Sequence, residues 1–121
     1  MNQPLRVLVV EDDALLAMDL AQNLSAAGLE VVGPATSVSR ALALIRNNAF
    51  DVAVIDVNLG RETAEPIALT LRQLGTPFIV LSGYSNEQQP PAFQGARVMS
   101  KPVSPTALIA AIRQCSPKPP Q

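Results

Sequence analysis

The stretch VAVIDVNLG, residues 52–60, joins four apolar residues with strand character to an acidic residue, Asp56. A run of this kind is typical of a strand that is buried on both faces of a parallel sheet. Asp56 then lies at the rim of the core, where a carboxylate is costly to bury unless another group pairs with it. The rest of the chain must therefore supply neighbouring strands for residues 52–55 and a partner for Asp56.

Strands and helices are expected to alternate along the chain on both sides of this stretch. The apolar runs predict strands at residues 5–10, 29–33, 51–56, 76–82 and 95–101. Apolar residues at helical spacing predict helices at residues 13–28, 37–48, 66–75 and 105–114. This alternation predicts an α/β fold, a doubly wound five-stranded parallel sheet with right-handed crossovers.

One segment breaks the alternation. Between Ser82 and Gly95 lies GYSNEQQPPAFQ, where a helix is due. It has little apolar periodicity, and Pro90 and Pro91 stop a helix there. A fourth helix that is short or absent is therefore expected.

The composition limits the class of protein. A chain of 121 residues with 48% hydrophobic residues suits one domain with one core, and with 3% aromatic residues that core must be aliphatic. The net charge is −1 and the basic residues are scattered, so no nucleic-acid footprint is visible. Histidine is absent, which excludes histidine-based catalysis, histidine metal ligands and a phosphohistidine relay within this chain.

The sequence also indicates a compartment and a boundary. The single cysteine, Cys115, cannot form an internal disulfide, which fits a reducing compartment, and no signal peptide or membrane span is visible. We expect a cytoplasmic domain at residues 1–114, followed by a flexible, proline-rich tail at 115–121.

Chemically active side chains follow the predicted strands. Glu11 and Asp12 follow the first strand, Asp56 the third, Ser82 the fourth and Lys101 the fifth. The carboxyl ends of parallel strands form one edge of a doubly wound sheet, where its chemistry collects, so these groups are expected to converge.

This set of groups suits phosphoryl transfer. Clustered carboxylates repel one another unless a cation is present, and their hard oxygen ligands suit Mg²⁺. An ionised Asp56 can act as a nucleophile, as aspartates do in acyl-phosphate chemistry. Lys101 can neutralise charge on the transferring phosphoryl group, and Ser82 offers it a hydrogen bond.

These residues lie in the motifs VLVVEDD, VIDVNLG, VLSG and MSKP, and with them residues 5–114 resemble the receiver domain of two-component response regulators. The resemblance implies a flavodoxin-like fold with strand order 2-1-3-4-5. It implies Asp56 as the acceptor of a phosphoryl group from a histidine kinase, and Mg²⁺ held by Glu11, Asp12, Asp56 and the backbone carbonyl of Asn58. It further implies Ser82 as the switch hydroxyl, Lys101 as the site lysine and a cis bond before Pro102.

One position departs from the common receiver pattern. Receivers usually carry Phe or Tyr three residues before the lysine, where this chain has Val98, so Tyr84 is the alternative switch aromatic. The stretch PFIVLSGYS resembles a receiver subgroup with a shortened fourth helix that is associated with HWE-type histidine kinases. Leu81-Ser82 replaces the Ala-Thr of that subgroup.

Alternatives from other classes remain open. A degenerate receiver would dock on partners without being phosphorylated, although the complete set of site residues argues against it. A haloacid-dehalogenase-like phosphatase also uses a nucleophilic aspartate, but its first-strand Asp-x-Asp spacing is absent here. The chain ends about seven residues after the last predicted helix, so it is either a stand-alone receiver or a fragment of a larger regulator or hybrid kinase. It would turn over no external substrate and is not expected to be an enzyme in that sense. The cognate kinase, the downstream protein target and a weak dimer are left open.

Overall fold

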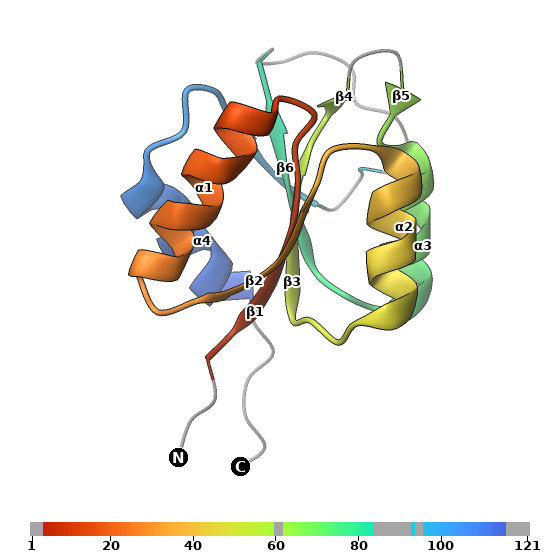
Figure 1. Cartoon of the computed structure of the whole chain (residues 1–121), viewed down its shortest axis with the longest axis horizontal. Coiled ribbons are helices and arrows are strands. Elements are labelled where there is room, and N and C mark those ends of the chain that lie inside the picture. The colour runs from red at the N-terminus through yellow and green to blue at the C-terminus, as the bar shows by residue number, and fades with distance from the viewer. Residues whose placement is uncertain (1–3, 60–61, 84–92, 94–95, 116–121) are drawn as a thin grey trace.

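A computed structural model of the chain describes residues 4–59, 62–83, 93 and 96–115. The five predicted strands and four predicted helices are present in their predicted order (Figure 1). The strands are β1 (Arg6–Val10), β2 (Glu30–Ala35), β3 (Val52–Asp56), β4 (Asn58–Leu59), β5 (Glu62–Thr63), β6 (Phe78–Ser82) and β7 (Arg97–Ser100). The helices are α1 (Ala14–Ala26), α2 (Val38–Asn47), α3 (Glu65–Leu74) and α4 (Pro105–Cys115).

The main sheet is parallel and has the order β2-β1-β3-β6-β7. Since β6 and β7 are the fourth and fifth strands of this sheet along the chain, the predicted order 2-1-3-4-5 is confirmed. Helices α1 and α4 cover one face of the sheet, and α2 and α3 cover the other (Figure 1). The fold is therefore the predicted flavodoxin-like, doubly wound α/β architecture.

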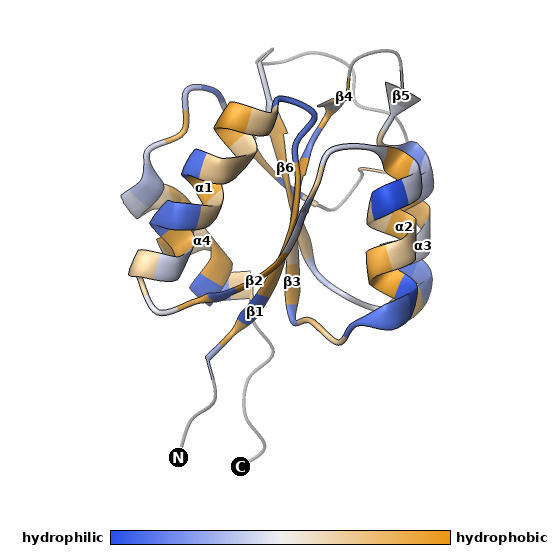
Figure 2. Ribbon diagram, in the orientation of Figure 1, coloured by the Kyte–Doolittle hydropathy of each residue, from blue (hydrophilic) through white to orange (hydrophobic). Residues whose placement is uncertain are grey.

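The opening stretch is the central strand of the sheet. All five residues of β3 are buried, with β1 on one side and β6 on the other. The apolar core divides into one cluster on each face, one containing Ile55 and Ile67 and the other Val54 and Leu108. Figure 2 shows the resulting apolar band along the strands. Burial on both faces explains why β3 has a continuous apolar run rather than an alternating pattern.

Local signals in the sequence set the helix ends. The Asp13 carboxylate accepts hydrogen bonds from the backbone amides of Leu15 and Leu16 and caps α1. After α1, Gly28 adopts φ +90, the left-handed conformation in which glycine has no steric penalty. These local contacts place the start of α1 directly after the Glu11–Asp12 pair.

Three details differ from the sequence-based expectations. Strand β2 continues two residues beyond residue 33, because Gly33 at φ +97 makes an irregular step and the Glu11 amide then donates to the Ala35 carbonyl at 2.9 Å. The peptide bond between Gly33 and Pro34 is cis. A short antiparallel pair, β4 with β5, follows β3, where no further strand was predicted.

Two predictions fall outside the described residues. The short or absent fourth helix concerns residues 83–94, of which the structure describes only 83 and 93. The proline-rich tail is described only at Cys115, which ends α4. Among the described residues, no helix has the length and apolar character needed to cross a bilayer.

Candidate phosphoacceptor site

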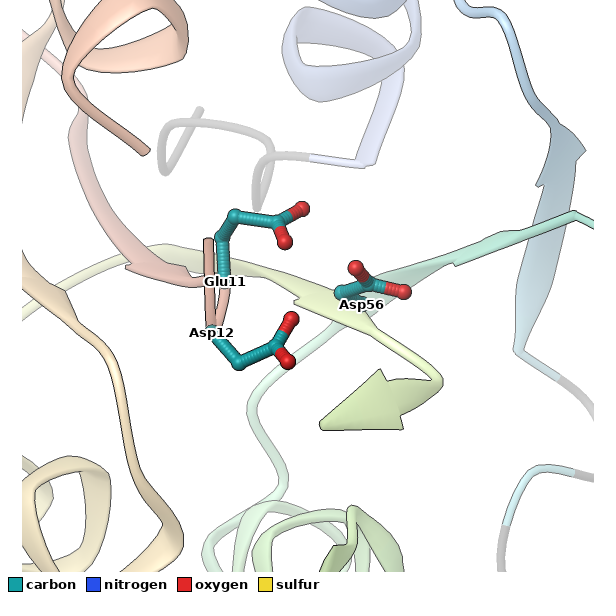
Figure 3. A group of neighbouring side chains, drawn as sticks. All are labelled: Glu11, Asp12 and Asp56. Carbon is teal, nitrogen blue, oxygen red and sulfur yellow. The ribbon is translucent and has the colours of Figure 1, made fainter. Parts of the chain in front are cut away.

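Three carboxylates converge at the carboxyl edge of the sheet. Glu11 and Asp12 lie in the turn after β1, and Asp56 is the last residue of β3. One oxygen from each lies within 4.8 Å of the others. Figure 3 shows the Glu11 and Asp12 side chains extending from their turn toward the side where Asp56 lies. Glu11 and Asp56 are 45 residues apart in the sequence, and the parallel alignment of β1 with β3 brings them together. This is expected because the carboxyl ends of parallel strands form one edge of the sheet.

Lys101 is the partner that the buried Asp56 needs. The Asp56 residue is 1% exposed, and its Oδ2 accepts a hydrogen bond from Lys101 Nζ at 2.6 Å. The same ammonium lies 3.8 Å from Glu11 Oε2. The lysine thus compensates part of the negative charge of the site, with its closest contact at the predicted acceptor.

Glu11 is the second buried carboxyl group of the site, and its pKa is raised. It is 4% exposed, its Oε1 accepts a hydrogen bond from the Asp13 amide at 3.2 Å, and its Oε2 faces Lys101. Burial, followed by a hydrogen bond shared with Asp56, raises the pKa of Glu11 from 4.5 to about 7. The Glu11 carboxyl is therefore partly protonated at neutral pH in the metal-free site.

The position of Lys101 depends on its neighbours in β6 and β7. Its backbone amide donates to the Ser82 carbonyl at 2.8 Å, and its peptide bond to Pro102 is cis, as the receiver resemblance implied. Partial burial opposes the charged form of Lys101, but the hydrogen bond to Asp56 and the nearby acids outweigh it and raise its pKa. Lys101 therefore remains an ammonium at neutral pH.

Ser82 lies at the end of β6, which pairs with β3. It is 2% exposed, and its neighbour Leu81 pairs directly with Asp56. Ser82 itself pairs with Ser100, the residue before Lys101. The backbone therefore brings the predicted switch hydroxyl to the same edge of the sheet as Asp56 and Lys101.

The structure describes only part of the remaining predicted set. Asn58 begins β4 and pairs with Thr63, so its backbone lies two residues beyond Asp56 in the short hairpin. Tyr84 lies outside the described residues. Val98, which occupies the usual aromatic position, is 42% exposed on β7.

The oxygen ligands at this edge fit a divalent cation. Two buried carboxyls and the exposed carboxylate of Asp12 form a hard, anionic donor set of the kind that binds Mg²⁺. Burial, followed by the hydrogen bond with Asp56, raises the pKa of Glu11, and a bound cation would favour its ionised form. If Mg²⁺ binds here, the carboxylates of Asp12 and Asp56 would hold it, with the Asn58 carbonyl as the further ligand that the resemblance implies.

Comparison with known proteins shows which family the chain belongs to. Residues 7–113 match the response regulator receiver domain. This chain belongs to that family. The match extends from β1 through most of α4, so it includes all the strands and helices that form the site.

Solved receivers share the fold of this receiver domain. A receiver domain protein from Methanospirillum hungatei superposes with a TM-score of 0.83 at 28% identity, over 92% of each chain. SdrG from Sphingomonas melonis superposes with a TM-score of 0.78 at 31% identity, over 95% of this chain and 98% of that one.

A curated relative is longer than this receiver domain. The transcriptional regulatory protein PdtaR of Mycobacterium tuberculosis is 34% identical over 113 residues, which cover 90% of this chain and 55% of the relative. The chain thus spans about half the length of that protein.

One feature beside the site of the receiver domain is not predicted by the sequence. A cavity between α1 and α4 is lined by Glu11 and Lys101 as well as by apolar side chains. Leu16 and Leu20 are four residues apart, a spacing that indicates one apolar face of α1. A sequence pattern carries no information about whether the facing helix fills the space.

Proposed function

We propose that this receiver domain accepts a phosphoryl group from the phosphohistidine of a histidine kinase onto Asp56, and that phosphorylation changes its contacts with a protein target. The observation that carries the proposal is the pairing of a buried acceptor carboxylate with an ammonium at 2.6 Å, beside two further acids. An ion pair on its own has many structural uses, but this acid-rich surrounding raises the cost of the site and favours a functional role.

The transfer requires few groups. An oxygen of the Asp56 carboxylate attacks the phosphorus, an acyl phosphate P–O bond forms, and the P–N bond to the kinase histidine breaks. Lys101 would move its hydrogen bond to a phosphoryl oxygen, and the Ser82 hydroxyl would donate to another. Water would later hydrolyse the acyl phosphate, so the domain would catalyse only its own modification and its reversal.

The acidic cluster would hold Mg²⁺ during this chemistry. The bound ion supplies positive charge to the phosphoryl oxygens and keeps the carboxylates ionised. Asp12 would contribute its exposed carboxylate to the ion. Glu11 would act from behind, because its two oxygens already face the Asp13 amide and Lys101.

The partner is proposed to be a kinase of the HWE type in the cytoplasm. The support is the stretch at residues 77–85, PFIVLSGYS, which is similar to the corresponding stretch of receivers associated with such kinases. The activity of any larger protein that contains this domain is a separate question, because the chain covers only 55% of the mycobacterial regulator.

Incubation with acetyl phosphate and Mg²⁺ tests the acceptor directly. Intact mass should increase by one phosphoryl group in the wild type and remain unchanged in Asp56→Asn, a near-isosteric change that preserves the fold. Asp19→Asn, at an exposed position on α1, is the matched control and should be labelled normally. Stoichiometric labelling of Asp56→Asn would show that the acceptor is a different residue.

Phosphotransfer profiling tests the kinase class. Purified HWE-type kinases, autophosphorylated with labelled ATP, should transfer label to this domain faster than kinases of other types at equal concentration. Preferential transfer from another kinase type would contradict the HWE assignment while leaving Asp56 as the acceptor. No label from acetyl phosphate or from any kinase would instead favour a docking module that works without phosphorylation.

A further inference from the structure

A cavity of about 510 Å³ lies between α1 and α4, next to the acceptor site. Its apolar lining comes from α1, α4, β6 and the turn before α4, and includes Leu16, Leu20, Leu81, Val103 and Leu108. A volume of this size with a mainly apolar lining and a few polar groups is typical of sites for small organic ligands.

The polar groups of the cavity favour a cation. Glu11, Asp19, Asn23 and Lys101 line it, and the Lys101 ammonium is engaged by Asp56 at 2.6 Å. Asp19 is exposed, and within the described part of the chain no ion pair joins its carboxylate to a basic side chain. A carboxylate at the rim of an apolar cavity complements a ligand with one ammonium group.

We propose that this cavity binds a small amphiphilic amine, with its apolar body against Leu16 and Leu20 and its ammonium group at Asp19. The proposal goes beyond the phosphorylation of Asp56, and binding to the unmodified domain does not require that the proposed acceptor function be correct.

The exposed surface of α1 beside the cavity makes it possible to distinguish a small ligand from a protein partner. Leu15 and Met18 are 79% and 57% exposed on the same helix but do not line the cavity. A small amine in the cavity leaves these two side chains in water. A protein laid along α1 would cover them as well, so the two occupants predict different sets of sensitive residues.

Three ligands that share a phenyl ring test the charge preference. Methyl NMR spectra of the full chain, with excess Mg²⁺ present to occupy the acidic cluster, would follow titrations with 2-phenylethylamine, 2-phenylethanol and 3-phenylpropionate. The amine should bind with a Kd of about 1 mM and shift the methyl signals of Leu16, Leu20, Val103 and Leu108. The alcohol should bind several-fold more weakly, and the acid more weakly still. Equal affinity for amine and acid, or shifts confined to residues outside the cavity, would overturn the proposal.

Matched variants on one helix test the location. Leu16→Gln and Met18→Gln change side chains of similar size and exposure, 53% and 57%, but only Leu16 lines the cavity. Leu16→Gln should weaken amine binding several-fold, and Met18→Gln should leave it unchanged. Asp19→Asn should weaken the amine about threefold and leave the alcohol unaffected, as expected for an exposed ion pair. Equal effects of the two glutamine variants, or equal loss of amine and alcohol in Asp19→Asn, would contradict the assignment.

Discussion

Lys101 Nζ lies 2.6 Å from Asp56 Oδ2, although 45 residues separate the two in the chain. Of the three acids at the site, Asp56 is the one that this lysine contacts most closely, since Glu11 Oε2 is 3.8 Å away. The lysine therefore lies beside the carboxylate that we propose as the phosphoryl acceptor. The Lys101 ammonium would have to move only a short distance to exchange a carboxylate oxygen for a phosphoryl oxygen as its hydrogen-bond acceptor. This favours a preorganised transfer site.

Lys101→Met is expected to slow phosphorylation of Asp56 by acetyl phosphate about 100-fold, because one preorganised positive donor to the phosphoryl oxygens is lost. Methionine keeps the length of the aliphatic stem, so packing changes little. Rates would be measured by intact mass against time. Arg97→Met, which removes an exposed cation from β7, is the control and should phosphorylate at the wild-type rate. An equal rate in Lys101→Met and wild type would exclude a role for the lysine in transfer.

Asp12→Ala is expected to weaken Mg²⁺ binding at least tenfold, and more than Glu11→Ala does. The exposed Asp12 carboxylate has room to bind the ion, whereas the oxygens of Glu11 already face the Asp13 amide and Lys101. Isothermal titration calorimetry at constant pH would give the two dissociation constants. Asp13→Asn retains the cap of α1 and should bind Mg²⁺ almost normally. The reverse order, with Glu11→Ala the weaker binder, would make Glu11 the principal ligand of the pair.

The metal-free domain is expected to lose stability as pH rises from about 4.5 to about 7. In the unfolded chain Glu11 has its ordinary pKa of 4.5, and in the folded chain burial and the nearby Asp56 raise it to about 7. The folded state therefore holds the proton more tightly, so this contribution is fully present below pH 4.5 and is lost as pH rises through 7. Its upper limit is on the order of 3 kcal/mol.

Urea unfolding across this pH range, without Mg²⁺, measures the effect. Glu11→Gln cannot titrate and should remove most of the pH dependence of the free energy of unfolding. Adding Mg²⁺ to the wild type should increase its stability at the upper end of the pH range. If the wild type and Glu11→Gln show the same dependence on pH, the raised pKa of Glu11 is contradicted.

Phosphorylation is expected to change hydrogen exchange across residues 83–94. Val98 has no ring to rotate inward and is 42% exposed on β7. A movement of Ser82 on phosphorylation must therefore be transmitted through another segment. Inward movement of Ser82 would pull on the residues that follow it, including Tyr84, and on the adjacent face of α4. Exchange would be compared between the unmodified and beryllofluoride-bound forms.

Tyr84→Ala should impair the response of a partner while sparing phosphorylation of Asp56, and Tyr84→Phe should retain most of the response because the ring is kept. Unchanged exchange at 83–94, together with changes elsewhere, would exclude this segment as the switch.

The sequence alone determined the alternation of strands and helices, the strand order through its receiver motifs, and the residues that meet at the carboxyl edge. Those features follow from short-range patterns, such as the continuous apolar run before Asp56, the Asp13 cap and Gly28 after α1. The motifs also supplied the cis bond before Pro102, which no periodicity predicts.

The tertiary structure alone decided which acid Lys101 contacts most closely, how far burial raises the pKa of Glu11, and how much space remains between α1 and α4. It also decided the continuation of β2 past Gly33, which brings the Ala35 carbonyl to the Glu11 amide. Each of these depends on distances between segments that are remote in the chain. Electrostatic energies and packing change steeply over one or two ångströms, a scale that residue spacing along a sequence does not specify.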